Sequence, residues 1–283
     1  MKPEQYDIIK DKHYYKTMGV ITAGILLYVW HMICKKNSKY KCMMESLMYY
    51  LTFIIFAIVN IPILVSALIF YPFGLYIPSL ISKITYFLFD LVFLRSLIIY
   101  THDIDKKQNY VQMLNHQGFI DGNLGFLLQK IPTVLATGYV KNIPVVGQIG
   151  RLFNFTFIEK DKSNSVEIVV NKLKDNPKLA LALFPEGERL FDHKFHPEKV
   201  RSGGFVIAKQ AGCSILPIYQ TYGNILQDDV RKYRFDGRSF IIFGKPITTE
   251  NKEVAQLVQE YCQEMLKLET MSKNLEKQYK LLY

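Results

Sequence analysis

Two long apolar segments near the N-terminus constrain the folding of this chain more than any other feature of its sequence. Met18–Cys34 is apolar apart from one threonine and His31, and Ser46–Phe70 contains no formal charge. A bilayer core of about 30 Å is crossed by about 20 helical residues, so the second segment is long enough to span it and the first is just long enough. A soluble protein of 283 residues would have to bury both segments as uniformly apolar helices. The sequence therefore predicts attachment to a membrane.

The topology of this region stays open at the level of sequence. The link 35–41 carries four lysines and the residues before Met18 also carry four, so the positive-inside bias selects neither orientation. Two full spans and a re-entrant or interfacial hairpin both leave the rest of the chain on the side of residue 1. Pro62 should kink the second segment. A third apolar stretch, 75–100, is expected to be an interfacial or domain-packed helix because it contains three charged residues: Lys83, Asp90 and Arg95.

From about residue 97 the pattern changes to short strands that alternate with helices. Runs typical of strands occur at 96–100, 110–114, 133–140, 154–159, 179–184, 214–219 and 239–244. Helical spacing occurs at 119–131, at 165–177 before Pro177, at 203–212 closed by Gly212, and from 250 to about 280. This alternation predicts an α/β fold with a mostly parallel mixed sheet flanked by helices. We expect membrane-anchoring helices over 1–95 and a catalytic domain over 96–283.

Charge and cysteine content narrow the class of function. The net charge of +10 suggests an anionic partner such as nucleic acid, an acidic membrane surface or a phosphorylated substrate, or else only a basic solvated surface. No run of five basic residues and no RNA-binding aromatic signature is present, so no nucleic-acid partner is predicted. His193 and His196 are interpreted as surface loop residues rather than metal ligands. The cysteines lack the spacing of a zinc site or a disulfide scaffold, which favours a reducing compartment: Cys34, Cys42, Cys213 and Cys262.

Two expected loops carry residues suited to chemistry. His116 and Asp121 follow the strand at 110–114, and the sequence FPEGER, 184–189, follows the strand at 179–184. Carboxyl ends of parallel strands meet at one edge of a sheet, where functional loops gather. Glycine permits unusual backbone angles, and the arginine fork suits phosphate oxygens. A base in one loop and an anion clamp in the other fit a reaction on a phosphorylated alcohol. A chance histidine–aspartate pair and an ordinary turn with a surface ion pair are the simpler alternatives.

Taken together and in order, these motifs resemble the glycerolipid acyltransferases, which include the 1-acyl-glycerol-3-phosphate acyltransferases. NHQGFID resembles the family's N-H-x-x-x-x-D, and LFPEGERL is similar to its F-P-E-G-T-R. GRLFNFTFIEKDK, 150–162, resembles the second block, SILPIY with Pro217 resembles the fourth, and FGKPI, 243–247, fits a closing block. The resemblance covers about residues 95–250. The blocks are specific as an ordered set, although each alone is not.

The resemblance implies a role for each matched residue. His116 would act as general base on the free sn-2 hydroxyl of a lysophospholipid, and Asp121 would orient its imidazole and stabilise the imidazolium. The hydroxyl would then attack the thioester of acyl-CoA with no acyl-enzyme, metal or cofactor, giving phosphatidic acid when the acceptor is 1-acyl-glycerol-3-phosphate. The absence of G-x-S-x-G argues against a serine hydrolase. The residues implied to bind substrate are Asn115, Arg151, Lys160, Glu186, Gly187, Arg189, Arg201 and Pro217.

Two departures from the family pattern widen the range of acceptors. Lys160 stands where an arginine is usual, which keeps the charge but loses the bidentate geometry. Glu188 stands where a threonine is usual, and its charge should disfavour a phosphate monoester unless it points away. Another head group, such as that of a lysophosphodiester or lysocardiolipin, and glycerol 3-phosphate are therefore alternatives, as is a catalytically inert lipid-binding relative. Because acyl-CoA is available in the cytosol, we expect a cytosol-facing site on an intracellular membrane such as the endoplasmic reticulum.

Overall fold

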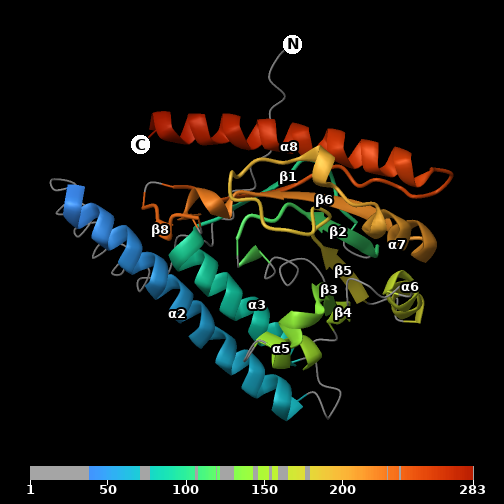
Figure 1. Cartoon of the computed structure of the whole chain (residues 1–283), viewed down its shortest axis with the longest axis horizontal. Helices are drawn as coiled ribbons and strands as arrows, with labels where there is room; N and C mark the ends of the chain where they lie inside the picture. The colour runs from blue at the N-terminus through green and yellow to red at the C-terminus, as the bar shows by residue number, and fades with distance from the viewer. Residues whose placement is uncertain are drawn as a thin grey trace.

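The fold is described from a computed structural model of the chain (Figure 1). The structure describes residues 38–70, 77–105, 108–118, 120–121, 131–142, 146–152, 155–158, 165–175, 179–227, 229–235 and 237–282. Three predictions fall outside these residues: the first apolar segment, Met18–Cys34, most of the helix expected at 119–131, and the placement of Lys160.

The main sheet has seven strands within the described residues, in the order β1-β9-β6-β2-β5-β3-β4. Of these strand pairs, β6 and β9 alone are antiparallel, which confirms the mostly parallel mixed sheet. The strands of this sheet are β1 (Leu97–Tyr100), β2 (Tyr110–Leu114), β3 (Ile131–Thr137), β4 (Thr156–Ile158), β5 (Leu179–Leu183), β6 (Ser214–Gln220) and β9 (Phe240–Phe243). A small antiparallel pair, β7 (Leu226–Gln227) and β8 (Lys232–Tyr233), was not predicted.

Helices cover both faces of this sheet, as Figure 1 shows, with α8 along one side and the N-terminal helices along the other. Side chains in β2 alternate between two cores, as the period of a strand requires. Val111 and Met113 pack in the core that contains residues of α6, α7 and α8, whereas Tyr110 and Leu114 pack in the core that contains residues of α2. The helices of the α/β domain are α5 (Val146–Leu152), α6 (Ser165–Asp175), α7 (Gly203–Ala211) and α8 (Val254–Leu282).

The helix ends follow the predicted signals. Gly212 ends α7 with φ of 65°, and its N–H caps the carbonyls of Ala208 and Lys209. Helix α6 ends at Asp175, just before Pro177. The strand expected over 133–140 is shorter at its end, because the chain turns into a 3-10 segment at Gly138–Asn142.

The second apolar segment forms α2 (Ser38–Phe70), a helix of 33 residues that contains Pro62. By length and composition it could cross a membrane, and it is the one helix in the described part of the chain that meets this test, over Cys42–Ser66. It packs beside α3 (Ile77–Phe89), and the hydroxyl of Tyr86 donates to Asn60 Oδ1 at 2.6 Å between the two helices. Many large apolar side chains on α2 nevertheless face outward: Met43, Leu47, Phe53, Ile54, Ile58, Ile61, Val65 and Ile69.

The third apolar stretch is tied to the α/β domain by its charged residues. Helix α3 continues into a π-helical turn, Asp90–Leu94, which leads directly into β1. The buried carboxylate of Asp90 accepts hydrogen bonds from the Ser96 hydroxyl at 2.5 Å and the Ser96 N–H at 3.1 Å. Arg95 donates to the carbonyl of Phe235 at 3.1 Å. These groups serve contacts within the protein, as a domain-packed helix requires, whereas Ile84, Phe87 and Leu88 of α3 are exposed, as an interfacial helix requires.

Candidate active site

His116 lies just beyond the carboxyl end of β2, next to a buried carboxylate. Its Nδ1 is 3.0 Å from Asp121 Oδ2. The same oxygen of Asp121 accepts the backbone N–H of Gly118 at 2.7 Å and that of Gln117. Asp121 is fully buried, so these donors fix its position. A carboxylate at Nδ1 favours the tautomer with the proton on that nitrogen and leaves Nε2 able to accept a proton.

The imidazole of His116 also has a defined tilt. It stacks on the ring of Phe184, which follows β5, with centroids 4.1 Å apart and planes 17° apart. The His116 side chain retains 22% exposure, so part of the ring reaches the surface. A histidine that is held on one side and open on the other suits proton transfer with a bound ligand.

The segment after β5 holds the main chain of His116 at both of its polar groups. The N–H of His116 donates to Glu186 Oε2 at 2.8 Å, and its carbonyl accepts the N–H of Leu190 at 2.8 Å. The two motifs seen in the sequence, one after β2 and one after β5, are thus joined directly. This juxtaposition follows from the parallel pairing of β2 with β5.

Glu186 is a buried acid in the middle of this arrangement. Burial raises its pKa to about 7; the hydrogen bond from the His116 N–H lowers it, the charge of Asp121 raises it, and the cations His196 and Lys199 lower it. Because the Glu186 side chain is 1% exposed and bonded to the backbone of His116, its geometry is that of a positioning group. The family resemblance had instead implied that Glu186 contacts the substrate.

Gly187 and Arg201 lie close together in the loop after β5. Gly187 has φ of +69°, and a Cβ there would lie 2.9 Å from the guanidinium carbon of Arg201. Glycine at 187 therefore serves both the turn and the close approach of the arginine. Arg189 is exposed two residues further on, with its guanidinium 5.6 Å from the centre of the Phe191 ring. Two guanidinium groups thus belong to the loop that touches His116.

Asn115 and Pro217 are enclosed in the sheet. The Asn115 amide exchanges two hydrogen bonds with the backbone of Gln220, at 2.8 and 2.9 Å, and its carbonyl accepts Gln220 Nε2 at 2.7 Å. Both side chains are almost fully buried. Pro217 lies within β6 opposite Met113 of β2. Neither residue presents its side chain to solvent, so both support the strand ends rather than forming a surface.

Arg151 lies in the last turn of α5, which follows β3 and the 3-10 segment Gly138–Asn142. It is exposed at the end of α5, and its guanidinium donates to the carbonyl of Lys141 at 3.3 Å. Within the described residues, no hydrogen bond or ion pair joins Arg151 to the residues around His116. Lys160 lies outside the described part of the chain.

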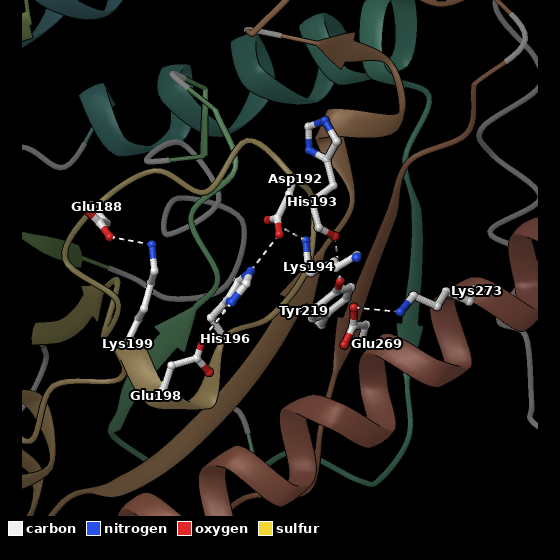
Figure 2. A network of polar contacts seen from close by, with 10 residues as sticks. All are labelled: Glu188, Asp192, His193, Lys194, His196, Glu198, Lys199, Tyr219, Glu269 and Lys273. Carbon is white, nitrogen blue, oxygen red and sulfur yellow. Dashed lines mark hydrogen bonds and ion pairs between the residues drawn. The ribbon is translucent and has the colours of Figure 1, made fainter.

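Sequence reasoning missed two groups that shape the site, Gln220 and Lys199. A buried glutamine at the end of β6 became recognisable only when Asn115 was placed beside it. Lys199 forms an ion pair with Glu188 at 2.8 Å, seen in Figure 2. The carboxylate of Glu188, which departs from the family pattern, is therefore offset by a nearby cation.

The metal and surface predictions concern the same loop. His196 is 27% exposed and bonded to two carboxylates, as expected of a surface loop residue. Across the described ranges no group of three or more histidine, cysteine, aspartate or glutamate residues could hold a metal ion.

Comparison with known proteins places this geometry in context. The family model described as Acyltransferase matches residues 97–221. A 1-acyl-sn-glycerol-3-phosphate acyltransferase of Saccharomyces cerevisiae is 30% identical over 151 residues, which are 51% of this chain and 49% of that protein. An uncharacterized acyltransferase of Schizosaccharomyces pombe is 26% identical over 152 residues, 52% of this chain and 54% of that protein. The chain thus spans about half the length of the curated relatives it matches.

A solved structure shares the fold. The crystal structure of the 1-acyl-sn-glycerophosphate (LPA) acyltransferase from Thermotoga maritima superposes with a TM-score of 0.66. The superposition covers 83% of this chain and 98% of the other, at 18% sequence identity. At this identity the likeness establishes the arrangement of the sheet and its helices.

Proposed function

Because the acyltransferase family model matches residues 97–221 of this chain, we propose that the protein transfers an acyl group from acyl-CoA to the free hydroxyl of a lysophospholipid. One observation carries the proposal. The Nδ1 of His116 is held by the buried carboxylate of Asp121, and the main chain of His116 is hydrogen-bonded to a loop that contains two arginines. A general base and two arginines that can bind an anion are thereby held next to each other.

The reaction proceeds by direct transfer. Nε2 of His116 removes the proton of the acceptor hydroxyl as its oxygen bonds to the thioester carbonyl carbon. The carbon–sulfur bond then breaks, and the thiolate of coenzyme A takes the proton back from the imidazolium. Asp121 stabilises that imidazolium through Nδ1. A positioned base of this kind contributes about 10²–10⁴-fold in rate, and holding both substrates in line contributes further.

Positive side chains around the Gly187 turn bind the phosphate of the acceptor. Arg189 and Arg201 supply planar donors, and the fork of an arginine matches two phosphate oxygens. Lys160 and Arg151 add positive charge along the path by which the phosphate of the acceptor reaches the site. Asn115, Glu186 and Pro217 act behind them by holding strand ends and the His116 main chain.

The acceptor in this proposal is 1-acyl-glycerol-3-phosphate, and the product is phosphatidic acid. The Saccharomyces cerevisiae relative is named for this acceptor, which supports the choice. The pairing of Glu188 with Lys199 supports it too, since the pair reduces the repulsion that a bare carboxylate would exert on a phosphate monoester. A lysophosphodiester is the second candidate, because Glu188 remains an acid beside Arg189.

The protein works at a membrane in this proposal, with residues 1–95 as the anchor and 96–283 as the catalytic domain. The outward apolar side chains of α2 and its length support this assignment. The active site faces the cytosol of an intracellular membrane, where acyl-CoA is available.

An acceptor panel tests the proposal. The purified protein is given one labelled acyl-CoA with 1-acyl-glycerol-3-phosphate, several lysophosphodiesters, lysocardiolipin or glycerol 3-phosphate, and the products are separated by chromatography. We expect a labelled phospholipid that requires the lysolipid, and its loss in the His116→Ala variant. Protein that binds lysolipid but forms no product with any acceptor would instead indicate an inert lipid-binding relative.

A further inference from the structure

The chain between β5 and α7 forms a loop that closes on itself. It comprises residues 185–201 (the 185–201 loop). The N–H of Arg201 at its end donates to the carbonyl of Pro185 at its start, at 3.0 Å. Loops with adjoining ends and internal packing are compact units that often carry function. The 185–201 loop contains both groups that bond the main chain of His116, namely Glu186 and the N–H of Leu190.

His196 bridges two carboxylates on either side of it in the 185–201 loop, Asp192 and Glu198. Its Nε2 lies 2.7 Å from Asp192 Oδ2 and its Nδ1 lies 2.8 Å from Glu198 Oε1, as Figure 2 shows. Both partners are hydrogen-bond acceptors when ionised, so the imidazole satisfies them only with a proton on each nitrogen. The geometry therefore requires the imidazolium form.

Other contacts around this bridge close the loop over its core. Lys199 pairs with Glu188 at 2.8 Å, which joins the end of the loop to the start. The side chains of Leu190 and Phe195 are buried beneath the polar groups. The regular structure described in this loop is one short 3-10 turn, Pro197–Lys199. Bonds between side chains therefore contribute much of what holds the loop in its conformation.

We propose that His196 is a positioning residue for the acyl-transfer site, since its bridge between Asp192 and Glu198 holds the 185–201 loop in the shape that fixes His116 and presents Arg189. The inference rests on the proposed function, because His116 is the base of that reaction. It goes further by assigning a role to a histidine that touches no substrate.

The charge of His196 also reaches the centre of the site. The imidazolium and Lys199 both lower the pKa of the Glu186 carboxyl, against the effect of burial, and so favour the ionised form that accepts the His116 N–H. The titratable groups that hydrogen-bond His196 are Asp192 and Glu198, and the charge of Glu186 also acts on it. The two hydrogen bonds raise the pKa of His196.

The sign of the pH effect follows from this raised pKa. A base whose pKa is raised on folding stabilises the folded arrangement fully below its unfolded value, about 6.5. That contribution is lost as the pH rises through the folded value. The His196 bridge should therefore hold the loop fully below about pH 6.5 and release it as the pH rises through the raised pKa of His196.

The experiment compares His196→Gln with the wild type across pH, with His102→Gln as the matched control. His102 is an exposed histidine that bonds the Thr101 hydroxyl, outside the 185–201 loop. Initial rates of acyl transfer to the lysophospholipid are measured on the purified full-length protein. Below the pKa of His196 we expect kcat/KM to fall about tenfold in His196→Gln, as for the loss of two partly exposed charged hydrogen bonds. The ratio of wild type to variant should approach one at alkaline pH.

A loss of activity that is independent of pH, or a ratio near one throughout, would overturn the inference. The variant His196→Lys checks the role of charge, since its amine can pair with either carboxylate. It should recover part of the activity and keep it at a pH where the wild type has lost it. The control His102→Gln should follow the wild type at every pH.

Amide hydrogen exchange separates this inference from the proposed function. The N–H groups of His116 and Leu190 should exchange at least several-fold faster in His196→Gln, while those within β6 remain unchanged. Unchanged exchange at both positions would refute the positioning role even if acyl transfer is observed. Faster exchange in His196→Gln, together with a wild-type protein that transfers no acyl group, would refute the proposed function and leave the positioning role standing.

Discussion

Asp121 shows how one buried side chain sets both the shape and the chemistry of the site. Its Oδ2 receives the imidazole of His116 and the backbone N–H groups of Gln117 and Gly118. The carboxylate thereby holds the turn after β2 and favours the His116 tautomer with its proton on Nδ1. At this scale a motif of two residues is in fact a cluster of four hydrogen-bonding groups.

The variant Asp121→Asn should separate these two tasks. An amide is nearly isosteric and can keep the turn, but it removes the negative charge that stabilises the imidazolium. We expect kcat to fall by about 10²–10⁴-fold with little change in KM. Steady-state acyl transfer measures this, and Asp103→Asn on the exposed loop after β1 is the control. Wild-type kcat in Asp121→Asn would remove Asp121 from the mechanism.

Glu186 predicts a dependence of stability on pH. Burial raises its pKa from 4.5 to about 7, so the folded protein binds the proton more tightly than the unfolded chain. Its contribution to the free energy of unfolding should fall as the pH rises from about 4.5 to 7 and level off above that, by an amount on the order of 3 kcal/mol.

Denaturant unfolding at several pH values measures this effect. In Glu186→Gln the free energy of unfolding should vary less over that interval, while the amide oxygen can still accept the His116 N–H. Glu167→Gln, an exposed site on α6, should keep the wild-type slope. An equal slope in all three proteins would contradict the assignment.

At the scale of elements, the turn after β5 is where backbone conformation and charge meet. Gly187 combines a left-handed backbone with the guanidinium of Arg201 directly over it. Gly212 has a similar φ, of +65°, but open space where a Cβ would be. The two glycines therefore differ in what surrounds them while their backbones are alike.

This pair allows a matched substitution. Gly212→Ala should cost about 1–2 kcal/mol of unfolding free energy from the left-handed backbone alone. Gly187→Ala should cost that amount and also displace Arg201, with a several-fold rise in KM for the lysophospholipid. Denaturant unfolding and steady-state kinetics on both variants provide the comparison. Equal KM values in the two variants would show that Arg201 does not bind the acceptor.

Much of the element scale was predictable from local pattern. Apolar runs such as 179–184 and 214–219 became β5 and β6, and Gly212 ended α7 as expected. The pair β7 and β8 was missed because strands of two residues are too short to show a period. In the site, His116 with Asp121 could be read from sequence spacing. The Asn115–Gln220 pair could not, since it depends on the strand order that places β2 beside β6.

At the scale of the whole molecule, two surfaces of opposite character enclose the sheet. Helix α2 presents large apolar side chains outward, whereas α8 on the other side mixes apolar residues with many charged ones. Asp90 and Arg95 tie the end of the α3 segment to the α/β domain, which fixes the apolar helices relative to the sheet. Burial of apolar area in a bilayer would therefore orient the active site.

A polarity-sensitive fluorophore tests this orientation. With native cysteines replaced by serine, labels at Ile54→Cys or Ile58→Cys should shift to shorter wavelength when phospholipid vesicles are added, because these exposed positions enter the bilayer. A label at Leu266→Cys, an exposed apolar position on α8, is the control and should not shift. A shift at Leu266 alone would place the opposite face of the molecule on the membrane.

The joined ends of the 185–201 loop have a consequence for how such proteins diversify. Since Arg201 bonds Pro185, the whole stretch between them enters and leaves the scaffold at one point. The residues between these two ends can be replaced as one segment, because β5 and α7 fix where the loop begins and ends. Grafting the equivalent stretch of a relative with different acceptor preference into this chain should therefore transfer that preference while the sheet stays intact.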